Sequence, residues 1–340
     1  MTMELFGYPA DQWLPFVFAA LMGLSILIYV VLDGYDLGVG LLTPFADDDE
    51  QRDMMVASIG PFWDANETWL VLAIGLLLVA FPTAHGMILT TLYLPVFFLL
   101  IGLILRGVSF EFRVKARAKY KNLWNWLFFG GSLLATLAQG FMLGIYVMGL
   151  EHSFGTILFG ILCALALTLG YAFIGAAWLI LKGMDRLQRN AVIWAKDCIW
   201  GLVVGIGAIS LATPLVSDRI FDRWFVWPDM LWLSPLPILS LGLLALLWRS
   251  FRHLPADGDR WAWAPFTAAL GLFTLAFLGL AYSFYPYVVP ERLTIYEAAS
   301  APESLMIIGI GAIFVVPSIL GYTALAYWVF RGKAKALRYD

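Results

Sequence analysis

The sequence has few charged residues, and this scarcity decides the class of protein. Only 13% of its 340 residues are Asp, Glu, Lys or Arg, whereas an ordinary soluble domain has about 25%. The hydrophobic share is 61% and the mean hydropathy is +0.83. A soluble protein of this size could not bury so much apolar surface. The composition therefore excludes a soluble enzyme, a nucleic-acid-binding protein and a disordered chain, and it predicts a polytopic membrane protein.

Cysteine and histidine are scarce as well, with two and three residues. Cys163 and Cys198 both fall inside predicted spans, so no loop cysteine can form an extracellular disulfide. His85, His152 and His253 lie at span ends or in loops, so a pair of histidines facing each other across a haem is not expected within this chain. A single His or a Met could still be an axial ligand. There is no HExxH, CxxC or Walker motif, and no metal site is expected.

Nine apolar segments, each long enough to cross a bilayer as a helix, account for most of the chain. They show no apolar–polar alternation, which argues against a β-barrel. The sequence therefore predicts an all-α polytopic membrane protein with nine transmembrane helices, in a single integral membrane domain over residues 1–340. The predicted spans are 13–43, 56–82, 85–106, 123–149, 156–182, 193–215, 230–249, 262–285 and 303–331.

The basic residues are distributed unevenly between the two sides. Eighteen of the 21 lie in loops on one side, including the stretch 107–122 and the C-terminal Lys335 and Arg338. Only Arg219, Arg223 and Arg292 lie on the other side. The positive-inside rule then predicts a multi-pass protein of the bacterial cytoplasmic (inner) membrane, with a periplasmic N-terminus and a cytoplasmic C-terminus. The stretch 107–122 is interpreted as a loop near anionic headgroups rather than a nucleic-acid-binding patch.

Acidic side chains inside a hydrocarbon layer are costly, so those within the spans are candidates for function. Asp33 and Asp36 lie three residues apart near the inner end of the first span and share a helix face. We expect both near the cytoplasmic interface. The simpler interpretation of the pair is a hydrated helix end.

The second span carries Asp64 and Glu67 within the stretch GPFWDANETW. If its helix begins near Met55, the two carboxyls lie about 14 and 18 Å deep at 1.5 Å per residue, near the middle of the membrane. Carboxyls at that depth need a cationic partner, water or a bound proton. A group that holds and releases a proton there suits a proton relay, and the alternative is a structural hydrogen-bonded cluster.

Three neighbours in the same stretch, Trp63, Asn66 and Trp69, are candidates for that structural cluster or for contacts with quinone or lipid. Basic partners are few. Arg106 ends the third predicted span and is expected to snorkel toward the cytoplasmic surface.

Several stretches resemble subunit II of the cytochrome bd-type quinol oxidases, including the cyanide-insensitive branch. They cover most of the chain, and the WDxNxxW and DGxDxGxG patterns occur in the same order. The matching stretches are DGYDLGVGLLTPF at 33–45, IGPFWDANETWLV at 59–71, LRGVSFEFRVK at 105–115, LWNWLFFGGS at 123–132, FYPYVVP at 284–290 and VVPSILGYTALAYWVF at 315–330.

The resemblance implies two four-helix bundles plus one peripheral helix. It implies a heterodimer with subunit I, which carries haems b558, b595 and d, and with small accessory single-span subunits as further partners. This chain would be a haem-free subunit without catalytic residues, needed for assembly, and in some members it holds a structural quinone. By motif, Asp33 or Asp36 and Asp64 match positions proposed for the cytoplasmic proton path, whereas Glu67 stands where some members have Gln.

The resulting hypothesis is a subunit of an oxidase that oxidises quinol and reduces O2 to water. Asp33 and Asp36 would collect cytoplasmic protons and Asp64 would pass them inward, with Glu67 an optional neighbour. The expected partners are subunit I, quinone and membrane lipids. The alternative is a proton-coupled secondary transporter, because intramembrane acids and a Gly-Pro interruption suit proton coupling, although no inverted repeat is visible.

Overall fold

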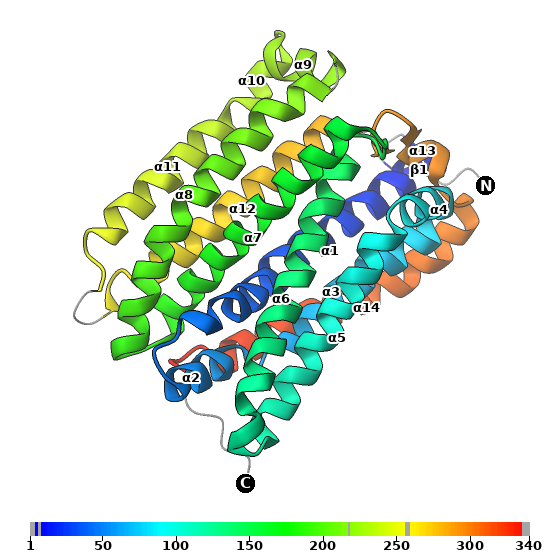
Figure 1. Ribbon diagram of the computed structural model, residues 1–340. Coiled ribbons are helices and arrows are strands. Elements are labelled where there is room, and N and C mark those ends of the chain that lie inside the picture. The colour runs from blue at the N-terminus through cyan, green and yellow to red at the C-terminus, as the bar shows by residue number, and fades with distance from the viewer. Residues whose placement is uncertain (1–3, 6–7, 217, 256–258, 335–340) are drawn as a thin grey trace.

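The computed structural model describes residues 4–5, 8–216, 218–255 and 259–334. Within them, nine helical segments are long and apolar enough to span a membrane, which confirms the predicted all-α fold. The helices run side by side along one common direction (Figure 1). The main spanning helices are α1 (Ala10–Leu42), α3 (Trp63–Ala80), α5 (Tyr93–Lys115), α6 (Ala118–Val147), α7 (Phe154–Lys182), α8 (Asp185–Val216), α11 (Pro235–Phe251), α12 (Trp263–Phe284) and α14 (Pro302–Val329).

The spanning helices divide into two groups of four and one helix at the periphery. Helices α1, α3, α5 and α6 form the first bundle, and α7, α8, α11 and α12 form the second. Helix α14 packs mainly against α1 and exposes most of its length (Figure 1). Helices α1 and α6 of the first bundle both pack against α7 of the second, and the most deeply buried stretches of α1 and α7 lie toward the same end.

Short elements close both ends of the bundles. Antiparallel strand pairs are β1 (Glu4–Leu5) with β2 (Tyr8–Pro9) and β3 (Tyr287–Val289) with β4 (Leu293–Thr294), the second pair containing an irregularity between Tyr287 and Val289. The short helices are α2 (Asp49–Ile59), α4 (Pro82–Thr91), α9 (Asp218–Phe225), α10 (Asp229–Leu233) and α13 (Ile295–Ala298), with a 3-10 turn at Thr43–Phe45.

The second predicted span, 56–82, is not one helix, and this expectation was wrong. Helix α2 ends at Ile59, a turn follows over residues 60–62, and α3 begins at Trp63. Pro61 is the reason, because it has no N–H to donate to the carbonyl oxygen four residues earlier and its ring clashes with that carbonyl. Helix α2 is instead a separate short helix, whose start is capped by the Asp48 side chain accepting from the Gln51 N–H.

Two other boundaries differ from the sequence prediction. The third predicted span, 85–106, is broken at Leu92 into α4 and α5, and α5 continues past Arg106 to Lys115. The seventh, 230–249, is divided at Ser234 into α10 and α11, and Pro235 occupies the first turn of α11, where proline is tolerated. The other six spans agree with the observed helices to within a few residues, apart from the start of α8 at Asp185.

Ion pairs join the loops at each end of the helices. Arg186, after α7, lies 2.7 Å from Asp47, which follows α1. At the opposite end, Arg219 lies 2.9 Å from Glu291. Each pair joins segments that lie at the same end of the molecule when nine helices cross in alternating directions. Of the basic residues used in the orientation prediction, Lys335 and Arg338 lie outside the described residues.

The end of α14 is anchored to the second bundle. Lys182 donates to the carbonyl oxygens of Phe330 at 2.6 Å and Gly332 at 3.1 Å. Lys333 lies 2.7 Å from Asp259. Partial burial acts to raise the pKa of Asp259, but the hydrogen bonds from Lys333 and Gln188 and the charge of Lys333 outweigh it and leave that pKa below its usual range. The stabilisation from this pair is present above the usual carboxyl pKa and is lost as the pH falls through the lowered value.

The contact between α1 and α7 depends on two glycines. A Cβ on Gly38 would lie 1.8 Å from the carbonyl oxygen of Tyr171, and one on Gly175 would lie 2.4 Å from the carbonyl carbon of Gly38. The two backbones therefore touch directly, as small residues allow in membrane helix packing.

Replacing Gly38 by Ala should separate α1 from α7 and destabilise the protein by about 1–3 kcal/mol, the usual cost of overpacking. Thermal unfolding of the purified protein measures this as a lower Tm. Gly75→Ala is the matched control, because a Cβ there meets no described atom within 4 Å. Equal Tm values for the Gly38→Ala variant and the unaltered protein would contradict the close contact.

Candidate functional site

One cation and three carboxyls meet inside the first bundle, and we refer to Asp33, Asp36, Glu67 and Arg106 as the ionic centre. Nη2 of Arg106 lies 2.7 Å from Oδ1 of Asp33 and also pairs with Oε1 of Glu67. Arg106 is 1% exposed and both aspartates are 0% exposed, whereas the Glu67 side chain is 27% exposed. Helices α1, α3 and α5 each contribute to this centre.

The helix register explains why Asp33 and Arg106 meet. Asp33 lies nine residues before the end of α1, and Arg106 lies nine residues before the end of α5. Both helices run toward the same end of the molecule, so both side chains lie about 13 Å inside that end at 1.5 Å per residue.

Two expectations are corrected by this geometry. Arg106 does not end its helix or snorkel to the surface, because α5 continues to Lys115 and two carboxyls surround the guanidinium inside the bundle. Asp33 and Asp36 are not a hydrated helix end at the interface, because neighbouring helices enclose both side chains completely.

Asp36 belongs to a hydrogen-bond network that reaches the peripheral helix. The Asn66 amide nitrogen donates to Oδ2 of Asp36 at 2.7 Å and to the Tyr35 hydroxyl at 3.0 Å. The hydroxyls of Tyr35 and Tyr327 are 2.5 Å apart, and that of Tyr327 donates to Oδ1 of Asn66 at 3.3 Å. Tyr327 of α14 thereby closes the network. Asn66 acts as a structural member of this cluster, one of the roles predicted for it.

Asp64 is not where the sequence analysis expected it. It lies in the first turn of α3, its side chain is exposed, and it makes no contact with Arg106. The depth of about 14 Å assumed a helix that began near residue 55, and the break at Pro61 removes that turn of helix. Asp64 and Glu67 are still one helical turn apart, but only Glu67 reaches the ionic centre.

The two tryptophans of this stretch differ in their surroundings. Trp63 packs against Phe110 at a ring separation of 4.9 Å and lies beneath Arg106, with 6.0 Å from the guanidinium carbon to the ring centroid. Trp69 is 1% exposed, and its indole N–H has no hydrogen-bond partner among the described residues. Trp63 thus covers the ionic centre, and Trp69 is part of the packed interior.

The sequence analysis missed polar residues that extend this interior toward α6 and α7. Gln139 of α6 donates to the Tyr29 hydroxyl at 2.8 Å and accepts from the Tyr171 hydroxyl at 2.9 Å. Tyr29 lies one helical turn before Asp33 and interacts with it. Gln139 could have been recognised from the sequence, because it lies in the middle of the predicted span 123–149 and a buried amide needs hydrogen-bond partners.

The charges of the ionic centre are not balanced. One guanidinium pairs with two carboxyls and a third lies nearby, so full ionisation of all three would leave two uncompensated negative charges in a largely buried, low-dielectric setting. Oδ1 of Asp36 and two of the Arg106 nitrogens have no hydrogen-bond partner among the described residues. Such buried polar atoms bind water when space allows. Unbalanced carboxyls beside sites for water are the chemistry that a proton-transfer site requires.

The histidines do not fit a haem site in this chain. His85 is in α4, His152 lies in the connection from α6 to α7, and His253 follows α11 at the opposite end, where its ring stacks on Trp261. None faces another across a bundle interior. Among the described residues, no group of three or more His, Cys, Asp or Glu side chains is arranged to hold a metal ion.

A family model for cytochrome bd terminal oxidase subunit II matches residues 14–330. This chain belongs to that family. Its relatives in the subunit II family include cytochrome bd-I ubiquinol oxidase subunit 2 of Escherichia coli (strain K12) and cytochrome bd ubiquinol oxidase subunit 2 of Bacillus subtilis (strain 168). Each is 28% identical and aligned over 94% of this chain and 95% of the relative.

The fold of this subunit II matches a solved oxidase structure. A chain of the bd oxidase from Geobacillus thermodenitrificans superposes with a TM-score of 0.76, at 18% identity, over 94% of this chain and 99% of the other. Subunit II is accordingly a multi-pass membrane protein of a terminal oxidase complex and has subunit I as its partner.

Arg106→Gln should cost about 3–5 kcal/mol of stability, because it leaves Asp33 and Glu67 without their cation in a buried site. The control is Arg186→Gln, which also removes an arginine paired with two carboxyls, but whose side chain is 59% exposed. That exposed pair should contribute less than about 1 kcal/mol. Thermal unfolding of both purified variants compares the losses, and similar losses would contradict a buried ion pair at Arg106.

Proposed function

We propose that this chain works with subunit I as a quinol oxidase that oxidises quinol and reduces O2 to water. Membership of the subunit II family supports this role, and the names of the relatives favour ubiquinol as the reductant. Haems b558, b595 and d belong to subunit I in this proposal, because the three histidines here do not face one another. Family membership also weighs against a secondary transporter.

In the same proposal, this chain stabilises the assembled oxidase and supplies part of the proton path from the cytoplasm. The proposed proton path is supported by a series of three carboxyl side chains whose solvent exposure decreases from one to the next. Asp64 is exposed, Glu67 is 27% exposed and contacts Arg106, and Asp33 on the other side of Arg106 is fully buried. Asp64 is thus the group nearest the surface, whereas the sequence predicted that Asp33 and Asp36 would collect protons and that Asp64 would lie deeper.

Arg106 has a defined part in this path. Its guanidinium bridges Glu67 and Asp33, so it links the partly exposed carboxyl of α3 to the buried carboxyl of α1. Asp36 lies on the same face of α1, one turn nearer the end of the helix than Asp33, and accepts a hydrogen bond from Asn66 of α3. Protons that enter at Asp64 would pass to Glu67 and then to the aspartates.

The test uses the complete oxidase with the variants Asp64→Asn and Glu67→Gln, which keep the shapes of the side chains and remove the titrating groups. We expect oxygen consumption with quinol to fall about tenfold or more in the Glu67→Gln variant, the scale of losing one proton-transfer group. A smaller fall is expected for Asp64→Asn, because an exposed carboxyl can be replaced by water.

Asp49→Asn is the control, since this carboxyl lies on α2 at the same end and is 57% exposed but has no contact with the series. It should leave turnover unchanged. Haem absorbance of each purified complex separates the two roles. Loss of haem in the Glu67→Gln variant would point to assembly alone, and full turnover with full haem would refute the path.

A further inference from the structure

The helical hairpin formed by α5, α6 and the short connection between them carries exposed basic and aromatic side chains at its tip. Three cations, Lys115, Arg117 and Lys119, are exposed within five residues. Among the described residues, no carboxyl forms an ion pair with any of them. Their charges are therefore available to an outside group.

The other two basic residues near the tip of this helical hairpin, Arg113 and Lys121, form contacts within the protein. Arg113 is buried and lies 2.6 Å from Asp53 of α2, and its Nε donates to Asn125 of α6. Lys121 lies 2.9 Å from the same aspartate. These contacts brace the tip of the hairpin against α2, so the exposed cations stand on a rigid support.

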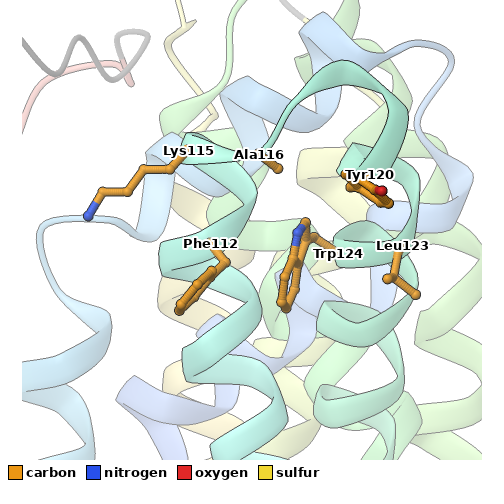
Figure 2. A pocket seen from close by; sticks show the side chains of 6 residues that line it. All are labelled: Phe112, Lys115, Ala116, Tyr120, Leu123 and Trp124. Carbon is orange, nitrogen blue, oxygen red and sulfur yellow. The ribbon is translucent and has the colours of Figure 1, made fainter.

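Aromatic rings lie directly beside the exposed cations. A cavity of about 180 Å³ is lined by Phe112, Lys115, Ala116, Tyr120, Leu123 and Trp124. The rings of Phe112 and Trp124 stack with centroids 5.3 Å apart. Figure 2 shows both rings pointing the same way from facing helices, while Lys115 extends from the tip away from them. Phe112 and Tyr120 are each at least half exposed.

We propose that this hairpin tip is a binding site for an anionic phospholipid of the adjacent leaflet. The phosphate would lie among Lys115, Arg117 and Lys119, and the glycerol and the first part of an acyl chain would pack against Phe112 and Trp124. Exposed aromatic rings beside basic side chains are typical of the membrane–water interface. Charge complementarity favours an anionic lipid over a zwitterionic one. The apolar rings of Phe112 and Trp124 favour a lipid over free phosphate.

The test is a titration of the purified oxidase complex with phosphatidylglycerol, measured by native mass spectrometry. The variant Lys115→Gln/Arg117→Gln/Lys119→Gln removes the three cations. Each basic residue near an anionic surface contributes about fivefold to binding, so the triple variant should bind phosphatidylglycerol on the order of a hundredfold more weakly. Phosphatidylcholine should bind the variant and the unaltered complex equally.

The matched control is Arg189→Gln/Lys196→Gln/Arg252→Gln, which removes three exposed cations from the same end of the second bundle. It should bind phosphatidylglycerol like the unaltered complex. A second variant, Trp124→Leu, should weaken phosphatidylglycerol binding while all cations remain. Inorganic phosphate at millimolar concentration should not compete.

Three results would overturn the proposal. The first is equal phosphatidylglycerol affinity in the triple variant and the control. The second is displacement of the lipid by inorganic phosphate, which would identify a site for free anions. The third is loss of subunit I from the triple variant with unchanged lipid affinity, which would identify a protein-binding surface. Thermal unfolding confirms that each variant is folded, and none of these outcomes depends on the proton path.

Discussion

A guanidinium enclosed by membrane helices is stable only when carboxylates lie within hydrogen-bonding distance of it, and this requirement organises the first bundle. Arg106 draws α1 and α3 to α5 through Asp33 and Glu67. Because a buried ion pair is costly to break, the relative heights of the three helices are constrained by it. The turn at Pro61 and the continuation of α5 past Arg106 to Lys115 set the heights at which these side chains meet.

The close contact of α1 with α7 complements this constraint. Membrane helices gain little from hydrophobic association, so direct backbone contacts between the bundles matter, and Gly38 and Gly175 provide one of them, while Gly140 and Gly144 of α6 provide another against α7. The same end of α1 carries Asp33 and Asp36. Polar residues with buried charge therefore lie where the surrounding helices are packed most tightly, which keeps lipid away from the ionic centre.

The peripheral helix connects the site to the second bundle. Tyr327 of α14 completes the network around Asn66, and the residues just after it are held by Lys182 at the end of α7. A helix with little buried surface thus has two polar anchors near one end. The network around Asp36 consequently depends on elements that are almost 300 residues apart in the chain.

The sequence by itself determined the membrane class, the nine crossings, the grouping of basic loops and the residues worth attention, because composition and hydropathy act locally. It also provided Asp33, Asp36, Glu67 and Arg106 as candidates. Only the tertiary structure decided that these four meet and that Asp64 does not. The reason is geometric: the break at Pro61 and the extra turns after Arg106 shift whole helices along their axes, and partners across helices depend on those shifts.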